Sequence, residues 1–473
     1  MGNTGLWMLL ATAIAMATSG LPAWVVLVGT ATLFSLGGLL TGALALPLLY
    51  ALPLRLLGLL EHDLLQALPL YVLAGALLNR LPLMDILFRV ALRLLHRTPA
   101  APYLAGMGLG ALLAPMNGSV GASISMLSRA VGQRLAAQGV AAERSAALVC
   151  SASTLGVVVP PSLVLILLGD AMMRAHTEAV NSTGQMVRIL NTQDVFHGAL
   201  GPAVALALLF GAVTWWRNRG AAPEPIGPTP AVSRKDWLLA MASVAGILAL
   251  LVSVTLGYLY AVEGAATGTL VLLLGGVASG SLTRPVFKAI LQDTLAISGS
   301  LFALLVAATS YTLVLRGFGT DVWMADALQH LPGGAWAATC VSLLMLLLSA
   351  FILDAFEIIF VIIPITMPPL LVLVPDATWV AVLALLVLQM GFLLPPFGYA
   401  ILMAGSVLRQ RLSMRALSRA LWPYLLVQVA VITAVLLWPQ LVWHGDNAST
   451  EPQLSEQEVQ QLLEQQRLDS EKE

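Results

Sequence analysis

The order of apolar and polar positions along the chain is dominated by long apolar runs. A bilayer core roughly 30 Å thick needs about 20 apolar residues for one helical crossing. Runs close to that length cover residues 5–19, 22–40, 62–79, 199–216, 237–257, 265–281, 291–315 and 421–442. Longer apolar stretches, interrupted by Gly, Pro and polar residues, cover 101–138, 145–172, 336–374 and 379–408. The pattern predicts an all-α polytopic membrane protein with about 11 transmembrane helices.

The composition agrees with a lipid environment. Of the 473 residues, 59% are hydrophobic and 10% are charged, and the mean hydropathy of +0.89 exceeds what a soluble core requires. The formal net charge of −1 provides no basic surface, so we expect no nucleic-acid partner. The two cysteines, Cys150 and Cys340, lie inside apolar runs and indicate neither a disulfide nor a metal site.

Two other function classes lack their sequence signatures. The histidines, which are scattered without a pair at metal-ligand spacing, are His62, His96, His176, His197, His330 and His444. No Gly-Lys-Ser/Thr phosphate loop occurs, so the sequence does not indicate an ATP-driven pump. We therefore expect neither an enzyme nor a transition-metal site.

The basic residues set the expected orientation, because Arg and Lys in short loops stay on the cytoplasmic side. One topology places five basic groups there: Arg89, Arg93 and Arg97; Arg129, Arg134 and Arg144; Arg217, Arg219, Arg234 and Lys235; Arg284 and Lys288; Arg409, Arg411, Arg415 and Arg419. The polar insert 174–198, the loop 316–334 and the C-terminal tail are then periplasmic. This topology requires 101–138 and 336–374 to be re-entrant hairpins that enter from opposite sides, so the two halves of the chain are inverted.

A repeated motif supports the inversion independently. The segments Thr154-Leu-Gly-Val-Val-Val-Pro-Pro-Ser162 and Met390-Gly-Phe-Leu-Leu-Pro-Pro-Phe-Gly398 share a Gly, three apolar residues and Pro-Pro. Asn117-Gly-Ser119 precedes the first of these glycines by 39 residues, and Asp354 precedes the second by 37. Each half therefore contains a polar hairpin tip followed by a broken helix. Two such halves in opposite orientation are typical of secondary transporters with a site at the bilayer midplane.

The residue types at the tips and breaks suit the binding of an ion and an anion. Proline has no N–H, so Pro-Pro leaves backbone carbonyls free, and these suit a hard cation such as Na⁺ together with hydroxyl or amide oxygens. The helix that restarts after each break offers N–H groups to an anion. The candidate ion-binding residues are Asn117, Ser119, Ser153, Thr154, Gly156, Asp354, Gly391 and Pro395. The candidate substrate-binding residues are Ser123, Pro160, Pro161, Ser162, Pro396, Gly398 and Arg316.

Each of these signals has a plainer alternative. A proline in a transmembrane helix is often only a kink, although the repeated Pro-Pro argues for more. Asn117 and the nearby serines could form hydrogen bonds between helices instead of binding an ion. Asp354 and Glu357 could be hydrated loop acids. Arg316 could extend its side chain to the membrane interface rather than to a substrate.

The chain resembles the large membrane subunit of tripartite ATP-independent periplasmic (TRAP) transporters over about residues 5–442. The segments that carry the resemblance are Gly20-Leu-Pro22, 68–75, 154–162, 351–357 and 394–398. Within the family, the stretches after Gly169-Asp170, at 194–202 and at 315–321 look most like the mannitol/chloroaromatic-type subgroup. Two positions depart from the family pattern, since Leu394 stands where a threonine is frequent and Ala152-Ser153 where Gly-Gly is frequent.

The resemblance implies an ion-transporter-superfamily fold with inverted repeats, a rigid scaffold, a mobile transport domain and elevator-type alternating access. It implies Na⁺ as the coupling ion without any other cofactor, and uptake of a small organic anion, a carboxylate, across the bacterial inner membrane. The implied partners are a small four-helix membrane subunit and a periplasmic substrate-binding protein. A stand-alone carrier of the same fold, of the dicarboxylate or citrate type, remains the alternative.

These expectations divide the chain into consecutive parts. They are scaffold helices and an arm (1–98), the first hairpin and broken helix (99–172), a periplasmic insert (173–198), the second scaffold and arm (199–335) with a cytoplasmic linker (217–235), the second hairpin and broken helix (336–408), a C-terminal scaffold helix (409–442) and a polar acidic, periplasmic tail (443–473) with a possible helix at 455–468. The two hairpins and the two broken helices together form the expected transport domain.

Overall fold

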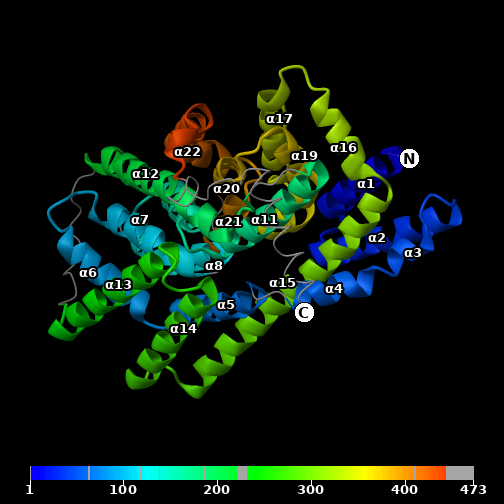
Figure 1. Ribbon diagram of the computed structural model, residues 1–473. Coiled ribbons are helices and arrows are strands. Elements are labelled where there is room, and N and C mark those ends of the chain that lie inside the picture. Colours follow the sequence, from blue (N-terminus) through cyan, green and yellow to red (C-terminus); the bar gives the residue numbers. More distant parts are fainter. Residues whose placement is uncertain are drawn as a thin grey trace, which may run out of the picture. The chain divides into compact units, whose positions relative to one another are not determined.

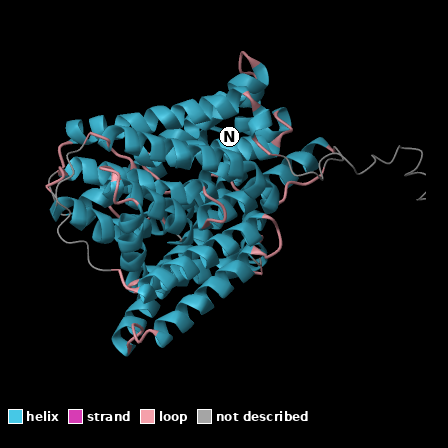
Figure 2. Ribbon diagram, turned by 90° about the vertical axis from the view of Figure 1, so that its left-hand side faces the viewer, coloured by secondary structure: helices cyan, strands magenta, loops and turns pink. Residues whose placement is uncertain are grey.

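The structure is a computed structural model that describes residues 2–61, 64–117, 119–137, 139–184, 188–220, 232–408 and 412–443. Helices joined by short turns make up these residues, and no β-strand occurs among them (Figure 2). Most of the linker 217–235, the positions of Arg409 and Arg411, and the tail after Trp443 with its expected helix lie outside the described residues. The all-α prediction is confirmed.

The first half of the chain contains the helices of the predicted scaffold, a hairpin and a broken helix. The scaffold helices are α1 (Gly2–Ser19), α2 (Ala23–Leu40), α3 (Leu46–Leu49), α4 (Leu52–Leu60), α5 (Leu64–Arg80) and α6 (Leu83–Leu94). The hairpin consists of α7 (Ala101–Leu113), the 3-10 turn η1 (Ala114–Asn117), α8 (Val120–Leu127), the π-helical turn η2 (Ser128–Gly132) and α9 (Gln133–Ala137). The broken helix and the helix after it are α10 (Ala142–Val158), α11 (Leu163–Thr183) and α12 (Thr192–Asn218).

The second half repeats this order. Its scaffold helices are α13 (Arg234–Thr255), α14 (Ala261–Ala278), α15 (Arg284–Gly317) and α16 (Thr320–Gln329). Its hairpin consists of α17 (Gly334–Ser349), α18 (Ala355–Glu357), the π-helical turn η3 (Ile358–Ile362) and α19 (Ile363–Leu373). The broken helix and the elements after it are α20 (Ala377–Leu393), α21 (Tyr399–Leu408), α22 (Met414–Leu437) and η4 (Pro439–Leu441).

The apolar runs of the sequence account for the long helices. Among the described residues, seven helices are long and apolar enough to cross a membrane, or up to nine if each of two bent pairs counts as one span. Shorter apolar helical segments of 10–17 residues are Thr4–Ser19 within α1, α17 and α20. The structure therefore supports a protein with several membrane-spanning helices, and the count of about 11 stays a prediction.

Both broken helices stop at Pro-Pro. α10 ends at Val158 and α11 begins at Leu163, with a bend of 41° between them. α20 ends at Leu393 and α21 begins at Tyr399. Because a proline ring blocks the helical hydrogen-bond ladder, the breaks lie where the sequence predicts them.

The two halves pack together in a repeated way. Figure 1 shows α14 of the second half beside α5 of the first, and α2 of the first half beside α15 of the second. Each hairpin packs on the broken helix of its own half, α7 on α10 and α17 on α20. Nearly every side chain of α20 is buried, so this helix belongs to the core.

The polar insert expected at 173–198 is largely helical. α11 continues to Thr183 and ends at Gly184, which has a left-handed backbone with φ +66°. α12 begins after Asn191, which forms a capping box with Asp194. Most of the described insert is therefore the end of one helix and the start of the next.

Residues predicted to share one side of the membrane also meet in the structure. Arg89 of α6 lies 3.8 Å from Asp236 of α13, both on the side predicted to be cytoplasmic. Arg316 of α15 lies 2.8 Å from Glu178 of α11, both on the opposite side. The grouping agrees with the predicted topology, and the assignment of each group to cytoplasm or periplasm stays a prediction.

Candidate functional site

A glycine holds each broken helix against the hairpin of its own half. A Cβ placed on Gly156 would lie 2.5 Å from the carbonyl carbon of Ala114 and 2.6 Å from its Cβ. A Cβ placed on Gly391 would overlap the Cβ of Ala350, the residue that follows α17. Only glycine permits these approaches, so the residue that opens each sequence motif is the point where hairpin and broken helix touch.

A small cavity lies between the first hairpin and the first broken helix. Its volume of about 10 Å³ gives room for a single water-sized occupant. Its lining includes Ser119 and Ser123 of the hairpin and Ser153 and Gly156 of α10. Its remaining lining residues are Ala114, Pro115, Val120, Val157, Leu163 and Val164. Four sequence-predicted site residues therefore converge on one space.

The three serines around this cavity differ in their hydrogen bonds. Ser119 Oγ accepts the N–H of Ala122 at 3.1 Å and caps α8. Ser123 Oγ donates to the carbonyl of Ser119 at 3.2 Å. Ser153 Oγ is fully buried and has no hydrogen-bond partner in the described part of the chain. Because an unsatisfied buried hydroxyl costs about 1–3 kcal/mol, an occupant that binds this oxygen would offset that cost.

Asn117 forms the tip of the first hairpin, next to the cavity. Its Nδ2 donates to Ser123 Oγ at 3.1 Å, whereas its buried Oδ1 has no partner among the residues that the structure describes. A Cβ placed on Gly75 of α5 would lie 2.6 Å from the carbonyl oxygen of Asn117. The tip is therefore fixed against the scaffold while it presents an unpaired amide oxygen.

Thr154 and Ser162 bond to the backbone of their own segment. Thr154 Oγ1 donates to the Ser151 carbonyl at 3.1 Å. Ser162 Oγ donates to the Val157 carbonyl at 3.0 Å and accepts the N–H of Leu165 at 3.1 Å, so it caps α11. Neither residue lines the small cavity. Their oxygens stabilise the break and the restart of the helix.

Each Pro-Pro pair, Pro160-Pro161 and Pro395-Pro396, changes the bonding of the glycine before it. The first proline lacks an N–H, so the carbonyl four residues earlier, on Gly156 or Gly391, loses its helical donor. The Gly391 carbonyl accepts the N–H of Leu394 at 3.4 Å instead. Gly156 is one of the residues that line the small cavity.

Gly398 closes the second break. Its N–H donates to the Leu394 carbonyl at 2.8 Å, and a Cβ at this position would lie 2.5 Å from the carbonyl oxygen of Phe392. No side chain fits there, so Gly398 is required for the turn between α20 and α21. The break of the second half does not line the small cavity of the first half.

The tip of the second hairpin is an acidic capping box. Asp354 Oδ1 accepts the N–H of Ala355 at 2.7 Å, and Glu357 Oε2 accepts the N–H of Asp354 at 3.0 Å. Both acids are partly buried. Asp354 thus begins the returning arm of its hairpin as Ser119 does in the first half, and a π-helical turn, often found at functional positions, follows in both.

Tyr399 connects the two halves and was not among the sequence-predicted site residues. It begins α21, and a Cβ placed on Gly121 of α8 would lie 3.3 Å from its hydroxyl. The carboxylates of Asp354 and Glu357 act on the same hydroxyl electrostatically. The only sequence signal for this residue is its position directly after Pro-Pro-Phe-Gly.

Gln389 is a second site candidate that the sequence reasoning missed. It lies two residues before Gly391, as Thr154 lies two residues before Gly156. Its side chain is fully buried, and within the described ranges neither amide atom has a hydrogen-bond partner. A polar residue inside the apolar run 379–408 is the signal that could have identified it.

Arg316 lies in a different place from the hairpin tips. Its guanidinium donates to Glu178 at 2.8 Å and to the carbonyl of Pro364 at 3.0 Å. It lines a cavity of about 490 Å³, together with Arg55 and Arg174, that shares no residue with the small cavity. Asp170 and Glu178 line the same cavity, so Arg316 lies among basic and acidic side chains and apart from the candidate ion ligands of the small cavity.

Comparison with known proteins identifies relatives along most of the chain. The family described as "Tripartite ATP-independent periplasmic transporter, DctM component" matches residues 8–441. The C4-dicarboxylate TRAP transporter large permease protein DctM of Rhodobacter capsulatus is 21% identical over 379 residues, 78% of this chain and 84% of that protein. The protein of the same name from Pseudomonas aeruginosa is 23% identical over 336 residues, 69% and 73% of the two chains.

Two further similarities concern a longer permease protein and a solved structure. The isethionate TRAP transporter permease protein DctMQ of Oleidesulfovibrio alaskensis is 22% identical over 379 residues, 78% of this chain and 56% of that protein. The solved structure of the YdaH transporter from Alcanivorax borkumensis has a TM-score of 0.57 and 15% identity, and the match covers 83% of this chain and 88% of that one. At this identity, the second similarity concerns the fold alone.

Proposed function

The chain belongs to the DctM family of tripartite ATP-independent periplasmic transporters, a family of multi-pass membrane permeases and not of enzymes, and from this premise we propose that it couples uptake of a small organic anion to Na⁺. The observation that carries the proposal is the small cavity between the first hairpin and the first broken helix. The bacterial inner membrane is the compartment that fits such a permease.

The lining of the cavity supports Na⁺ as its occupant. Hard cations prefer oxygen ligands, and transporters of this kind coordinate Na⁺ with carbonyls of unwound helices. Ser153 supplies a buried oxygen without a partner among the described residues, and Gly156 supplies a carbonyl that has lost its helical donor. Asp354, at the tip of the second hairpin, adds the negative charge that a second cation site would use.

The names of the relatives support an anionic substrate. Those relatives are described as transporters of C4-dicarboxylates and of isethionate, and both substrates are small organic anions. The restarting helices α11 and α21 offer backbone N–H groups at the two breaks, and Arg316 lies at the wall of the larger cavity. We propose a carboxylate as the substrate class.

The packing supports elevator-type alternating access. Gly156 and Gly391 join each hairpin to its broken helix so closely that the pairs are suited to moving as one transport domain. The scaffold would then include α1 to α6 and α13 to α16, in which α5 packs on α14 and α2 on α15 across the halves. The proposed partners, by family membership, are a small membrane subunit and a periplasmic substrate-binding protein.

Reconstitution tests the function directly. The chain would be purified with its small membrane subunit, placed in proteoliposomes, and supplied with the binding protein and a panel of radiolabelled C4-dicarboxylates and small sulfonates. We expect uptake that needs both an inward Na⁺ gradient and the binding protein. Equal uptake with K⁺ in place of Na⁺ would contradict Na⁺ coupling, and full uptake without the binding protein would favour a stand-alone carrier.

A further inference from the structure

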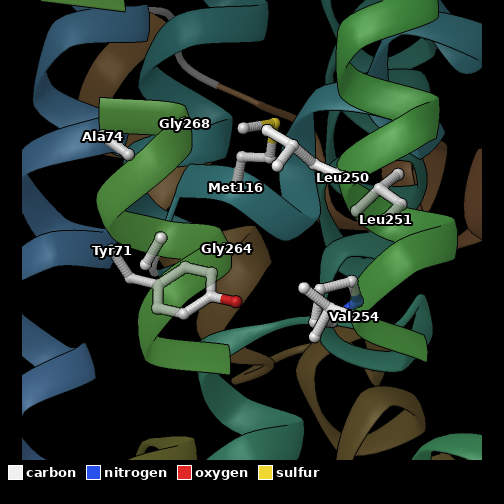
Figure 3. A pocket seen from close by; sticks show the side chains of 10 residues that line it. Tyr71, Ala74, Met116, Leu250, Leu251, Val254, Gly264 and Gly268 are labelled. Carbon is white, nitrogen blue, oxygen red and sulfur yellow. The ribbon is translucent and has the colours of Figure 1, made fainter. Parts of the chain in front are cut away.

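Two cavities occupy equivalent places in the two halves. One lies where the first hairpin meets α5, α13 and α14, and Tyr71, Met116 and Val254 line it (Figure 3). The other lies where the second hairpin meets α15, α1 and α2, and Tyr311 and Leu353 line it. In the order of elements, α1 and α2 of the first half correspond to α13 and α14 of the second, and α5 corresponds to the end of α15. The two cavities are therefore related by the repeat.

The two cavities differ strongly in volume. In the first, the side chains of Met116 and Leu250 lie together, Tyr71 extends toward Val254, and about 20 Å³ remains (Figure 3). The second has a volume of about 210 Å³. The same place is therefore packed in the first half and hollow in the second.

The wall of the second-half cavity, the one of about 210 Å³, is apolar. Its lining includes Leu9, Met16, Leu27, Met345, Leu353 and Ile362. Two of its hydroxyls are bonded to their own helices, since Ser349 donates to Met345 at 2.8 Å and Thr366 to Ile362 at 2.9 Å. An apolar protein cavity of about 150 Å³ stays dry and binds molecules such as benzene. Apart from the buried Tyr311 hydroxyl, which has no hydrogen-bond partner among the described residues, the wall offers few polar contacts to water, so an apolar ligand fits it better.

The second-half cavity is lined by residues that reach the surface of the molecule. Ile352, at the turn of the second hairpin, is 50% exposed, and Ala13 and Met16 of α1 are partly exposed. Beside them, Ile14 and Leu33 point outward from α1 and α2. Because α2 is long and apolar enough to cross a membrane, we expect hydrocarbon around this edge, from which an apolar ligand can enter.

We propose that this cavity binds an acyl chain of a membrane lipid. The chain would lie between α1, α2 and α15 on one side and the second hairpin on the other, in the space that Met116 and Leu250 fill in the first half. This inference goes beyond the proposed transport function and does not depend on it, because lipid binding is measured without substrate or ion gradient.

Photolabelling tests the inference. The full chain in nanodiscs would be exposed to a phospholipid that carries a diazirine in its acyl chain, and labelled residues would be mapped by mass spectrometry. We expect labels on Leu353 and its neighbours in the second hairpin and none at Tyr71. Ala13→Phe fills the cavity from α1 and should lower the Leu353 labelling at least fivefold. Ile14→Phe changes the adjacent outward position and should leave it unchanged.

A second filling variant covers the case in which Ala13→Phe does not fold. Ser349→Leu fills the cavity from the hairpin side and should lower the labelling in the same way, with thermal unfolding as the check of folding. Labelling of Leu353 that persists in the folded filling variants would overturn the proposal. So would labels confined to Ile14 and Leu33, or equal labelling at Tyr71.

Discussion

Gly156 of the first broken helix lies directly against Ala114 of the first hairpin, with no room for a side chain between them. The second half repeats the contact with Gly391 and Ala350. Because these contacts join the elements that carry the candidate ligands, the geometry of the small cavity depends on them. Several of the expected effects of substitution follow from this dependence.

Replacing Gly156 by Ala should separate the first hairpin from α10. The new Cβ would lie 2.7 Å from the backbone carbonyl oxygen of Ala114, and this atom can shift only if the hairpin backbone shifts with it. Such overpacking costs about 1–3 kcal/mol. We expect at least a tenfold loss of Na⁺-driven uptake. Gly108→Ala in α7 is the matched control, since nothing lies within 4 Å of a Cβ there. Equal uptake by wild type and Gly156→Ala would contradict the proposed contact.

Asp354→Asn should separate the charge of the second hairpin tip from its capping role. Asparagine caps helices as well as aspartate, so the start of α18 should keep its stability. If the charge serves a cation, Na⁺-driven uptake should fall tenfold or more while the unfolding temperature stays near that of wild type. Asp354→Ala should lose the cap as well, at a cost of about 1 kcal/mol. Normal uptake by Asp354→Asn would remove the carboxylate from the site.

Changing Pro160 and Pro161 together to Ala should let α10 continue. The alanines would supply N–H donors to the carbonyls of Gly156 and Val157, so the cavity would lose a free acceptor. We expect a higher Na⁺ concentration for half-maximal uptake. Pro202→Ala, inside α12, is the control for the loss of an ordinary helix proline. An unchanged Na⁺ dependence would reduce the Pro-Pro pair to a kink.

The pair of Arg316 and Glu178 allows a test by opposite effects. If Arg316 attracts the anionic substrate, Arg316→Gln should raise the KM for uptake, and Glu178→Gln should lower it because the guanidinium is released from its 2.8 Å contact. Both side chains are partly exposed, so we expect changes of only about three- to tenfold. Changes of KM in the same direction would show that the pair only joins α15 to α11.

The spans and breaks were predictable because their causes are local. Mean hydropathy along the chain predicted the positions of α12, α13, α14 and α22, and most of the predicted helix ends lie within a few residues of the observed ones. The exceptions include the starts of α12 and α22, which lie about seven residues earlier than predicted. Pro-Pro fixed both breaks, since a missing N–H acts on the helix that contains it. The expected insert 173–198 became largely helical partly because Arg174 pairs with Asp170 at 3.0 Å, one turn apart on α11.

The convergence of the site could be predicted only in part. The motif pointed to Ser119, Ser153 and Gly156, and the structure brings these together across the hairpin and α10. It did not point to Tyr399, whose hydroxyl lies near Gly121 of the other half, or to Gln389, a buried polar residue of the apolar run 379–408 that lies outside the motif. Thr154, though adjacent to Ser153, does not line the cavity, and its hydroxyl donates to the Ser151 carbonyl of its own helix.

The central claim, that the small cavity binds Na⁺, is tested most directly by thermal unfolding of the purified chain in NaCl against equal concentrations of KCl and choline chloride. A ligand at a hundred times its Kd stabilises a folded protein by about 2.7 kcal/mol. We expect a higher unfolding temperature in Na⁺ alone, lost in Ser153→Ala and kept in Ser151→Ala, whose buried hydroxyl does not line the cavity. Identical unfolding in all three salts, or a Na⁺ effect that survives Ser153→Ala, would contradict it.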